Sequence, residues 1–432
     1  MKTTLEKISS VKQKLKIEVP AEVVKNLRSQ ALAKVQKKAK IQGFRPGKVP
    51  LDVVERRFGA EVNQETIEEV VRETYPQAVA EQKLQPISRP HIEPGTLLVD
   101  QPFSYTATIE IRPEISVNGY EGMKLEKEEV EISKDQIGEE LKKIQQSMTQ
   151  LEPTPDETIL SAGHVATVDF SGKANGKPFK GSQAKDFSID IGSGGILPEF
   201  EKQLQGLKKG TTQSVRFDYP KDYFNKELAG QSAEFSVTVK DIRKKNVPVL
   251  NDEFAKDLGS YETLKQVEEM IADRLKQQQE GSIKGELHKK ILQELIQKNK
   301  FEVPESMIFA ELNSMIENLA QELSQRGQKL EDLNIQEVIA HYRPEAEFRT
   351  QSFLILDTIA NAEKLSVPDA DLEQFIENQA KSMQRPKEQL KAYYDSKQLL
   401  PSLKLRLLHE KSLEFVLSKA KIKTTKPKKK GS

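Results

Sequence analysis

The chain has 432 residues, of which 31% are charged and 36% hydrophobic, and its net charge is only +1. This length suits two to four domains, and a mean hydropathy of -0.61 indicates wide solvated surfaces. Cysteine is absent, which excludes disulfides, thiolate nucleophiles and cysteine metal sites and fits a reducing compartment. No run of about 18 apolar residues occurs and the first residues lack an apolar signal segment, so we expect a cytoplasmic protein with no membrane partner.

The N-terminal region is predicted to combine strands and helices. Apolar and polar residues alternate over residues 11–19 and again over 103–111, which is the period of half-buried strands. Between them, Pro20 begins a helix that we expect to end at Gly43, and a second helix starts at Pro50. The first helix has an apolar stripe of Val23, Val24, Leu27, Ala31 and Val35. A third, longer helix carries Ile67, Val70, Val71, Tyr75 and Val79 on one face.

A basic stretch runs through this region. No Asp or Glu occurs from Val23 to Leu51, whereas the positive residues there are Lys25, Arg28, Lys34, Lys37, Lys38, Lys40, Arg45 and Lys48. The stretch closes in GFRPGKVP, residues 43–50, where glycines allow a tight turn and Pro46 lowers the conformational entropy of the loop. Phe44 and Arg45 at its tip are typical hot-spot residues. Because the stretch has eight positive residues and no negative one, it should bind a polyanion such as RNA, and more weakly as salt rises. From charge and turn chemistry alone, an ordinary solvated helix followed by a helix-helix turn, with the phenylalanine of the turn folded back into the core, is equally favoured.

Residues 114–153 are predicted to be a connector with an acidic extended part and one helix. The helix carries Ile137, Leu141, Ile144 and Met148. Between about Ser161 and Lys244, glycines and aromatic residues rise together and short alternating runs recur, which predicts a small antiparallel β domain. The runs are Ala166, Val168 and Phe170; Val215, Phe217 and Tyr219; and Phe235, Val237 and Val239. The Asn175-Gly176 pair predicts a hairpin turn, because a type I′ turn needs positive φ at both residues.

Amphipathic helices follow from residue 247 to about residue 420. Their apolar stripes are Leu264, Val267, Met270, Ile271 and Leu275; Ile308, Leu312, Met315, Ile316, Leu319 and Leu323; and Leu372, Phe375, Ile376 and Met383. Prolines at positions 304, 344, 368, 386 and 401 are expected to mark helix boundaries. Because the region is highly charged and modestly apolar, some apolar patches should stay exposed. The lysine-rich residues 421–432 are predicted to be disordered.

Several patterns that suggest chemistry fail on inspection. GFRPGK has one residue too few between its glycines for a phosphate loop, and no Ser or Thr follows Lys48. GSGG at residues 192–195 fails the dinucleotide pattern because position 197 is leucine. The histidines are scattered, at His91, His164, His288, His341 and His409. Metal binding and histidine-based nucleophilic catalysis are therefore not expected, and neither is a cofactor, ATP included.

GFRPGKVP, on a loop between two helices of an N-terminal α+β unit, resembles the ribosome-binding signature of the trigger factor family of bacterial chaperones. The resemblance extends to a central β domain and a helical C-terminus. It implies that the contacts to the large ribosomal subunit, protein and rRNA, near the nascent-chain exit are made by Phe44, Arg45 and Pro46, with the loop shaped by Gly43, Gly47 and Lys48. It also implies an ATP-independent chaperone that holds unfolded nascent polypeptides through many weak contacts and serves the folding and export of new proteins, with a homodimer as an option off the ribosome.

The aromatic residues of the β domain are spaced similarly to those of FKBP-type prolyl isomerases, which line a dry cleft for a proline ring. From the residues alone, an ordinary core role stays open for each of them. The resemblance places in the pocket Phe170, Phe179, Phe187, Ile196, Leu197, Phe200, Tyr223 and Phe235. It gives the Leu197 backbone N–H and the Tyr223 hydroxyl the role of binding substrate carbonyls. Lys180 replaces the usual acidic residue and Phe200 the frequent tryptophan, which argues against tight binding of macrolide inhibitors.

Together these patterns predict a multidomain α+β chain. Its parts are an N-terminal α+β ribosome-binding domain (1–113), a linker (114–153), an FKBP-like antiparallel β domain (154–246), an elongated all-α substrate-binding domain (247–420) and a basic tail (421–432). Two other functions stay open. One is a free-standing isomerase whose flanking domains only deliver substrate, and the other is an RNA-binding protein that uses the basic stretch and the tail.

Overall fold

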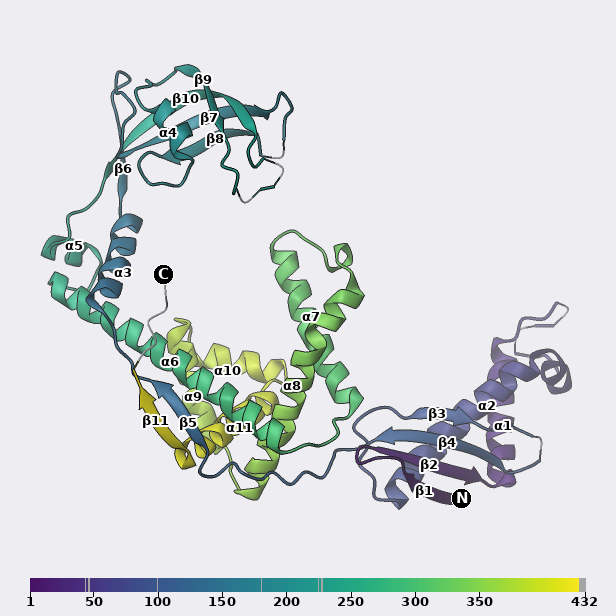
Figure 1. Cartoon of the computed structure of the whole chain (residues 1–432). Coiled ribbons are helices and arrows are strands. Elements are labelled where there is room, and N and C mark those ends of the chain that lie inside the picture. Colours follow the sequence, from purple (N-terminus) through teal and green to yellow (C-terminus); the bar gives the residue numbers. More distant parts are fainter. Residues whose placement is uncertain are drawn as a thin grey trace. The chain divides into compact units, whose positions relative to one another are not determined.

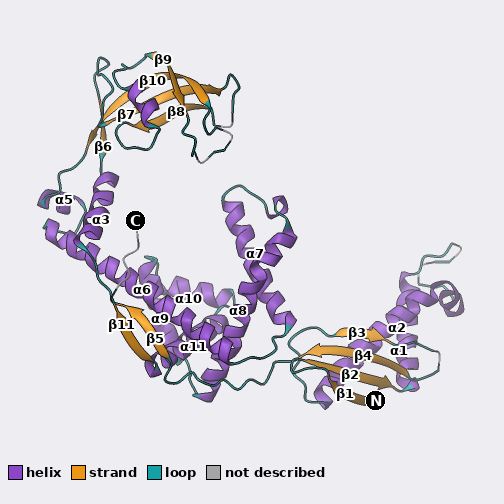
Figure 2. Cartoon of the chain, viewed as in Figure 1, coloured by secondary structure: helices purple, strands orange, loops and turns teal. Residues whose placement is uncertain are grey.

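The computed structural model describes residues 1–426 except Gly43, Pro46, Val99, Lys180, Phe224 and Glu227. The chain divides into two compact units. Figures 1 and 2 label the helices and strands of both. Unit 1 comprises Met1–Glu128 and Ile283–Lys426, and unit 2 includes Glu129–Ser282. None of the helices formed by the described residues combines the length and apolarity needed to cross a bilayer.

Unit 1 begins with a four-stranded antiparallel sheet in the order β1-β2-β4-β3. The strands are β1 (Lys2–Lys7), β2 (Lys12–Val19), β3 (His91–Pro94) and β4 (Phe103–Glu110). The alternation predicted for β2 and β4 is confirmed, since every second residue of β4 is buried from Phe103 to Ile109. β1 and β3 were not predicted, because both are short and mostly polar edge strands.

Helices α1 (Ala21–Lys38) and α2 (Leu51–Glu81) pack on this sheet. Two predicted helices after Pro50 form one helix with a kink, because Phe58 leaves helical geometry at φ -121 and ψ 24. Val23 is exposed, contrary to the predicted apolar stripe of α1, whereas the other four stripe residues are buried.

The end of α1 lies earlier than Gly43, which itself is outside the described residues. Ala39 is already extended, with φ -66 and ψ 126. The prediction of the helix end was wrong because Ile41 leaves the helical path to pack in a small apolar cluster.

Apart from one pair of short strands, the rest of unit 1 is helical. Its elements are the second half of α6 (Leu264–Lys298), α7 (Glu305–Gln325), the 3-10 turn η1 (Leu330–Asp332), α8 (Ile335–Ala362), α9 (Asp369–Ser382), α10 (Lys387–Ser396) and α11 (Leu400–Lys419). Four of the five marked prolines lie at helix starts, but Pro344 lies inside α8. Tertiary packing holds α8 together there, because Tyr342 and Ala346 on either side of the proline pack in one apolar cluster with residues of α7.

The predicted disorder from residue 421 is wrong for its first part. Lys421–Thr425 form β11, which pairs in parallel with β5 (Lys124–Glu128). The Lys421 N–H donates to the Met123 carbonyl at 2.7 Å. β5 offers an unpaired edge to a segment that contains β-branched residues, and this pairing outweighs the lysine content. Residues 427–432 lie outside the described residues.

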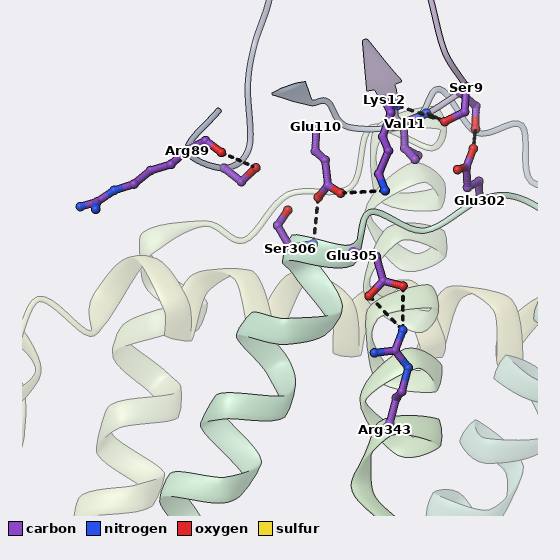
Figure 3. Close-up of polar contacts among 11 residues, drawn as sticks. Ser9, Val11, Lys12, Arg89, Glu110, Glu302, Glu305, Ser306 and Arg343 are labelled. Carbon is purple, nitrogen blue, oxygen red and sulfur yellow. Dashed lines mark hydrogen bonds and ion pairs between the residues drawn. The ribbon is translucent and has the colours of Figure 1, made fainter. Parts of the chain in front are cut away.

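Figure 3 shows where the N-terminal sheet of unit 1 meets α7. The Glu110 carboxylate at the end of β4 accepts a hydrogen bond from the Ser306 backbone N–H at 2.8 Å, and it lies 3.8 Å from Lys12 Nζ. Arg343 of α8 binds both oxygens of Glu305 at 2.7 and 2.9 Å. The first turn of α7 is therefore held by charged groups from two other elements.

Unit 2 contains a small helical layer and a β-sheet. The helix α3 (Lys134–Ser147) begins with a capping box made by Ser133 and Gln136, and it packs with α5 (Asp252–Asp257) and the first half of α6. The helix predicted in the connector is thus confirmed. Its apolar stripe packs against other helices, so this part of residues 114–153 is not a free linker.

The sheet of unit 2 is antiparallel, in the order β6-β10-β7-β8, with β9 paired to β10. Its strands are β6 (Gln150–Pro153), β7 (His164–Ala174), β8 (Gln183–Asp190), β9 (Thr212–Asp218) and β10 (Ser232–Asn246). Asn175 and Gly176 both have positive φ, 47° and 79°, so the predicted turn is confirmed. The short helix α4 (Pro198–Leu204) packs against the sheet (Figure 1).

Candidate functional site

A cavity of about 700 Å³ lies between α4 and the sheet of unit 2. Residues of β7, β8, β9, β10 and α4 line it together with the loops that follow β7, β8 and β9. The structure brings to this one cavity all eight residues placed there by resemblance, namely Phe170, Phe179, Phe187, Ile196, Leu197, Phe200, Tyr223 and Phe235. Its volume lies in the range of about 300–1,000 Å³ that is usual for ligand pockets.

Phe235 lies at the centre of the aromatic lining. Its ring centroid is 5.8 Å from Phe170, 6.1 Å from Phe179 and 5.6 Å from Phe200, all edge-to-face. Phe217 stacks on Phe235 at 5.8 Å. These geometries suit aromatic quadrupoles, so the rings hold one another in place without polar groups.

The rings differ in exposure. Phe200 and Phe235 are buried, Phe170 and Phe179 are half-buried, and Phe187 is 45% exposed at the rim. A cavity lined by ordered rings and open on one side can take up an apolar ring from solvent.

Sequence reasoning missed several lining residues, which are Gly181, Ile189, Gly194, Gly195, Pro198, Phe217, Tyr219, Asn225 and Leu228. Phe217 and Tyr219 belong to an alternating run that was recognised only as a strand. Tyr219 lies 4.6 Å from Tyr223 between ring centroids, and burial raises the pKa of its hydroxyl. The alternation identifies the inward face of β9 but not that this face borders a cavity.

Two polar groups of the site can be placed. Leu197 directly precedes α4, and its carbonyl accepts from the Phe200 and Glu201 N–H groups at 3.0 Å each. Within residues 1–426, as far as these are described, no acceptor is recorded for the Leu197 N–H. The Tyr223 ring is half-buried and lines the cavity, whereas Lys180 lies outside the described residues.

The glycine-rich turn beside Leu197 is held from α4. The Glu201 carboxylate accepts a hydrogen bond from the Gly192 N–H at 2.7 Å. Gly194 and Gly195 of this turn line the cavity. The turn is therefore attached to the same helix that supplies Phe200.

Ionisable groups are nearly absent from the lining. None of the described lining residues is Asp, Glu, His, Lys or Arg. No group of three or more His, Asp or Glu among the described residues could hold a metal ion. The described lining therefore offers shape, low polarity and hydrogen bonding.

A second candidate site is the loop after α1 in unit 1. Ile41 and Val49 are buried at its two ends, in a cluster with Val54 and Val62. The Gln36 side chain donates to the Val49 carbonyl at 2.6 Å. The loop is thus anchored at both ends to α1 and α2.

The tip of this loop faces solvent. Phe44 is 42% exposed and Arg45 is exposed, so the interpretation in which the phenylalanine folds into its own core is wrong. Gly47 has φ 78°, a conformation that glycine adopts without strain, and Lys48 is exposed. Gly43 and Pro46 lie outside the described residues.

The basic stretch is not uniformly free, because acidic residues from other segments reach it. Lys25 lies 3.4 Å from Asp100, and Arg28 lies 2.9 Å from Glu55. Lys34 pairs with two carboxylates of α2, Glu65 and Glu69. Across the described residues, no ion pair is recorded for the other five, which are Lys37, Lys38, Lys40, Arg45 and Lys48. The unpaired positive charge therefore gathers at the loop end of α1.

Comparison with known families covers most of the chain. Residues 1–144 match the family described as "Bacterial trigger factor protein (TF)", and residues 263–418 match its C-terminal counterpart. Residues 157–240 match the family described as "FKBP-type peptidyl-prolyl cis-trans isomerase".

Similar full-length proteins are each named "Trigger factor". The protein of Geotalea daltonii is 34% identical over 425 residues, which cover 98% of both chains. Those of Geobacter sulfurreducens and Desulfatibacillum aliphaticivorans are 33% and 35% identical and cover 98% of this chain. The alignments cover 99% and 98% of those two proteins.

A solved structure titled "Promiscuous Substrate Recognition in Folding and Assembly Activities of the Trigger Factor Chaperone" aligns with a TM-score of 0.52 and 19% identity. The alignment covers 97% of this chain and 99% of that one. At this identity the similarity shows the fold alone, and it extends over nearly the whole length.

Proposed function

This chain belongs to the trigger factor family, and from that premise we propose that Phe44 and Arg45 dock it on the large ribosomal subunit beside the nascent-chain exit. As a member it is a ribosome-associated chaperone with an FKBP-type peptidyl-prolyl cis-trans isomerase domain. The family implies binding of ribosomes and of nascent polypeptides. The proposal assigns these activities to particular residues of this chain.

The docking part is supported by exposure and charge at one loop tip. An exposed aromatic ring on an anchored loop loses little conformational entropy when it binds. The same segment, from the end of α1 to Lys48, carries five positive groups that form no ion pair with the described residues, which suits contact with rRNA as well as protein. Replacing Phe44, Arg45 and Pro46 together by alanine should abolish cosedimentation with ribosomes and leave the fold intact. Unchanged cosedimentation would refute the docking role, and retained binding to naked RNA would favour a general RNA-binding protein.

The isomerase part assigns catalysis to the cavity of unit 2. The observation that carries it is the convergence of eight aromatic or aliphatic residues on one cavity whose described lining contains no acid, histidine or cationic side chain. Rotation about a peptide bond is opposed by resonance, with a barrier of about 18–20 kcal/mol. The twisted amide has lost conjugation and is less polar than the planar one. An apolar, water-poor cavity therefore favours the twisted state over the ground state.

Two groups orient the substrate in this scheme. The Leu197 N–H and the Tyr223 hydroxyl donate hydrogen bonds to carbonyls of the substrate backbone, while Phe200 and Phe235 contact the proline ring. Holding the carbonyls while the prolyl ring lies in the cavity lets the intervening bond rotate. No proton needs to be transferred, so the rate should not depend on an ionisable catalytic group.

Alanine substitutions at Phe200 and Tyr223 test this assignment. Each should lower kcat/KM for a prolyl peptide about tenfold or more, since about 1.4 kcal/mol of lost transition-state binding already gives that factor. Suppression of aggregation of an unfolded client should persist in both variants. If suppression disappears together with isomerisation, a free-standing isomerase with delivery domains is the better description.

Client holding is assigned to the helices of unit 1. Phe309 on α7, Met383 after α9 and Tyr393 on α10 are large, exposed side chains with apolar surface. Several weak contacts of this kind bind an unfolded chain by multivalency, and methionine adapts to many partners. The proposal also retains four predictions made from the sequence. They are the domain boundaries, a cytoplasmic location with part of the protein on ribosomes, a homodimer off the ribosome, and a role in the folding and export of new proteins.

A further inference from the structure

Helix α4 supplies Phe200 to the cavity, yet its seven residues are too few for a helix that is stable by itself. Its position must come from contacts with the sheet. Phe200 and Leu204 are buried there, but apolar contacts are not directional and do not fix how the helix lies against a strand edge. A directional contact exists at Gln203.

The side-chain amide of Gln203 binds both backbone polar groups of one residue in β9. Its Nε2 donates to the Arg216 carbonyl at 2.7 Å, and its Oε1 accepts from the Arg216 N–H at 3.2 Å. Nε2 also donates to the Glu199 carbonyl at 3.2 Å within α4. In the described part of the chain β9 pairs only with β10, so its other edge is open. Gln203 makes at this edge the two bonds that a neighbouring strand would make.

We propose that Gln203 is a positioning residue that fixes α4 to β9 and thereby holds the Phe200 ring against the Phe217 ring in the lining of the cavity. Phe217 follows Arg216 directly in β9, and Phe200 lies three residues before Gln203 in α4. The two ring centroids are 5.7 Å apart at an interplanar angle of 85°. A displacement of α4 from β9 would break this edge-to-face pair and change the width of the cavity.

Such a displacement would loosen the contact between the cavity and the proline ring of the substrate. This inference rests on the proposed function, because it concerns the rate only if the cavity is the isomerase site. The expected size of the effect is moderate, since the bonds that Gln203 makes are neutral ones and the apolar packing of α4 stays in place.

Position 203 allows a test that depends on one hydrogen atom. Gln203→Glu keeps an acceptor for the Arg216 N–H, but the ionised carboxylate has no hydrogen to donate to the Arg216 carbonyl. Protonation of the introduced carboxyl restores that donor in nearly the same place. An effect of this kind depends on the bonds to Arg216, so a merely space-filling role for Gln203 would not produce it.

Other charged groups near position 203 are the same in the parent and in every variant, so the comparison with the parent and with Gln183→Glu removes their contribution. Those on α4 are Glu199, Glu201 and Lys202, those on β9 are Arg216 and Asp218, and Glu234 of β10 lies opposite Arg216. The Arg216 guanidinium donates to Glu234 at 2.7 Å. This hydrogen bond lowers the pKa of Glu234, so the pair stays ionised over mildly acidic pH.

The experiment measures kcat/KM for a prolyl peptide with the full chain and its variants from about pH 8 down to about pH 4.3, the ordinary pKa of glutamic acid. Gln203→Ala should lower kcat/KM about three- to tenfold at every pH, as expected for the loss of the two bonds to Arg216. Gln203→Glu should resemble Gln203→Ala at neutral pH and recover toward the parent as the pH falls. Gln183→Glu, the same charge change at an exposed position of β8, should follow the parent throughout.

Full activity in Gln203→Ala, or no recovery of Gln203→Glu relative to Gln183→Glu at low pH, would overturn the proposal. Phe200→Ala in the same series distinguishes this result from failure of the proposed site. If Phe200→Ala also keeps full kcat/KM, the cavity is not the site. Thermal unfolding of each variant is measured under the same conditions. If Gln203→Ala fails to fold, the kcat/KM of Gln203→Glu at neutral pH and at low pH still decides the question.

Discussion

The ring of Phe235 lies directly against the backbone of Gly172 in the neighbouring strand β7. A Cβ at position 172 would lie 2.3 Å from Cε1 and 2.4 Å from Cδ1 of this ring. Residues 235 and 172 are register partners in the β7–β10 pair. The absence of a side chain at position 172 therefore lets the central ring of the cavity lie across the sheet.

Gly172→Ala should push the Phe235 ring into the cavity. We expect a loss of stability of about 1–3 kcal/mol, as is usual for overpacking, and a larger fractional loss of isomerase activity than of client holding. Prolyl-peptide isomerisation and urea unfolding of the same preparations measure the two effects. Gly138→Ala on α3 is the matched control, because a Cβ there meets no atom within 4 Å. Full activity in Gly172→Ala would show that the ring position does not matter.

The unpaired lysines near the loop should carry the salt dependence of ribosome binding. Replacing Lys37, Lys38 and Lys40 by alanine should reduce the slope of log affinity against log salt concentration by about 1 for each lysine that contacts a phosphate. Lys25→Ala should change the slope less, because Lys25 already pairs with Asp100 at 3.4 Å. Equilibrium binding to purified ribosomes at several salt concentrations gives these slopes. An unchanged slope in the triple variant would mean that these lysines do not meet rRNA.

Acid should weaken the helical part of unit 1 through His409. The His409 ring lies 4.9 Å from the Phe353 ring between centroids. Burial lowers the pKa of His409 below its ordinary value; the charge of Asp357 raises this pKa, and the charge of Arg112 lowers it. The unfolded chain therefore binds more protons below about pH 6.5, so this contribution to stability is complete above that pH and is lost as the pH falls.

The stability of His409→Gln should consequently depend less on pH below about 6.5 than that of the parent. His288 contributes in the same direction, because burial also lowers its pKa, so some dependence will remain. Urea unfolding followed by circular dichroism at several pH values provides the comparison. His341→Gln, at an exposed position, should reproduce the parent's profile. If the His409 variant does so as well, the buried ring has no such effect.

Much of the fold could be predicted because its signals are local. The alternation in β2 and β4, the Asn175-Gly176 turn and the stripe of α3 each appear within a few residues. Elements that depend on distant partners were missed or misread. β1 has one apolar residue and is held by pairing to β2, and β11 forms only because β5 offers an edge. Their stability lies in tertiary contacts, which a local pattern does not contain.

The two candidate sites also differ in how much of each could be predicted from the sequence. The loop tip could be predicted from residues 43–50, because its chemistry is contiguous in sequence. The cavity residues were identified by resemblance, since an alternating strand pattern is the same for a core ring as for a lining ring. Gln203 and Gly172 gave no usable signal, because Gln203 acts through hydrogen bonds to the edge of a strand and Gly172 through the absence of a side chain.

The central claim is that the exposed tip of the loop after α1 contacts the ribosome. A photoreactive amino acid at position 44, with ribosomes that carry a nascent chain, tests it most directly. The account predicts a crosslink to a component of the large subunit near the nascent-chain exit, and none from the same group at the exposed position of Val23. Equal crosslinking from both positions, or crosslinks from position 44 only to residues of this chain, would contradict it.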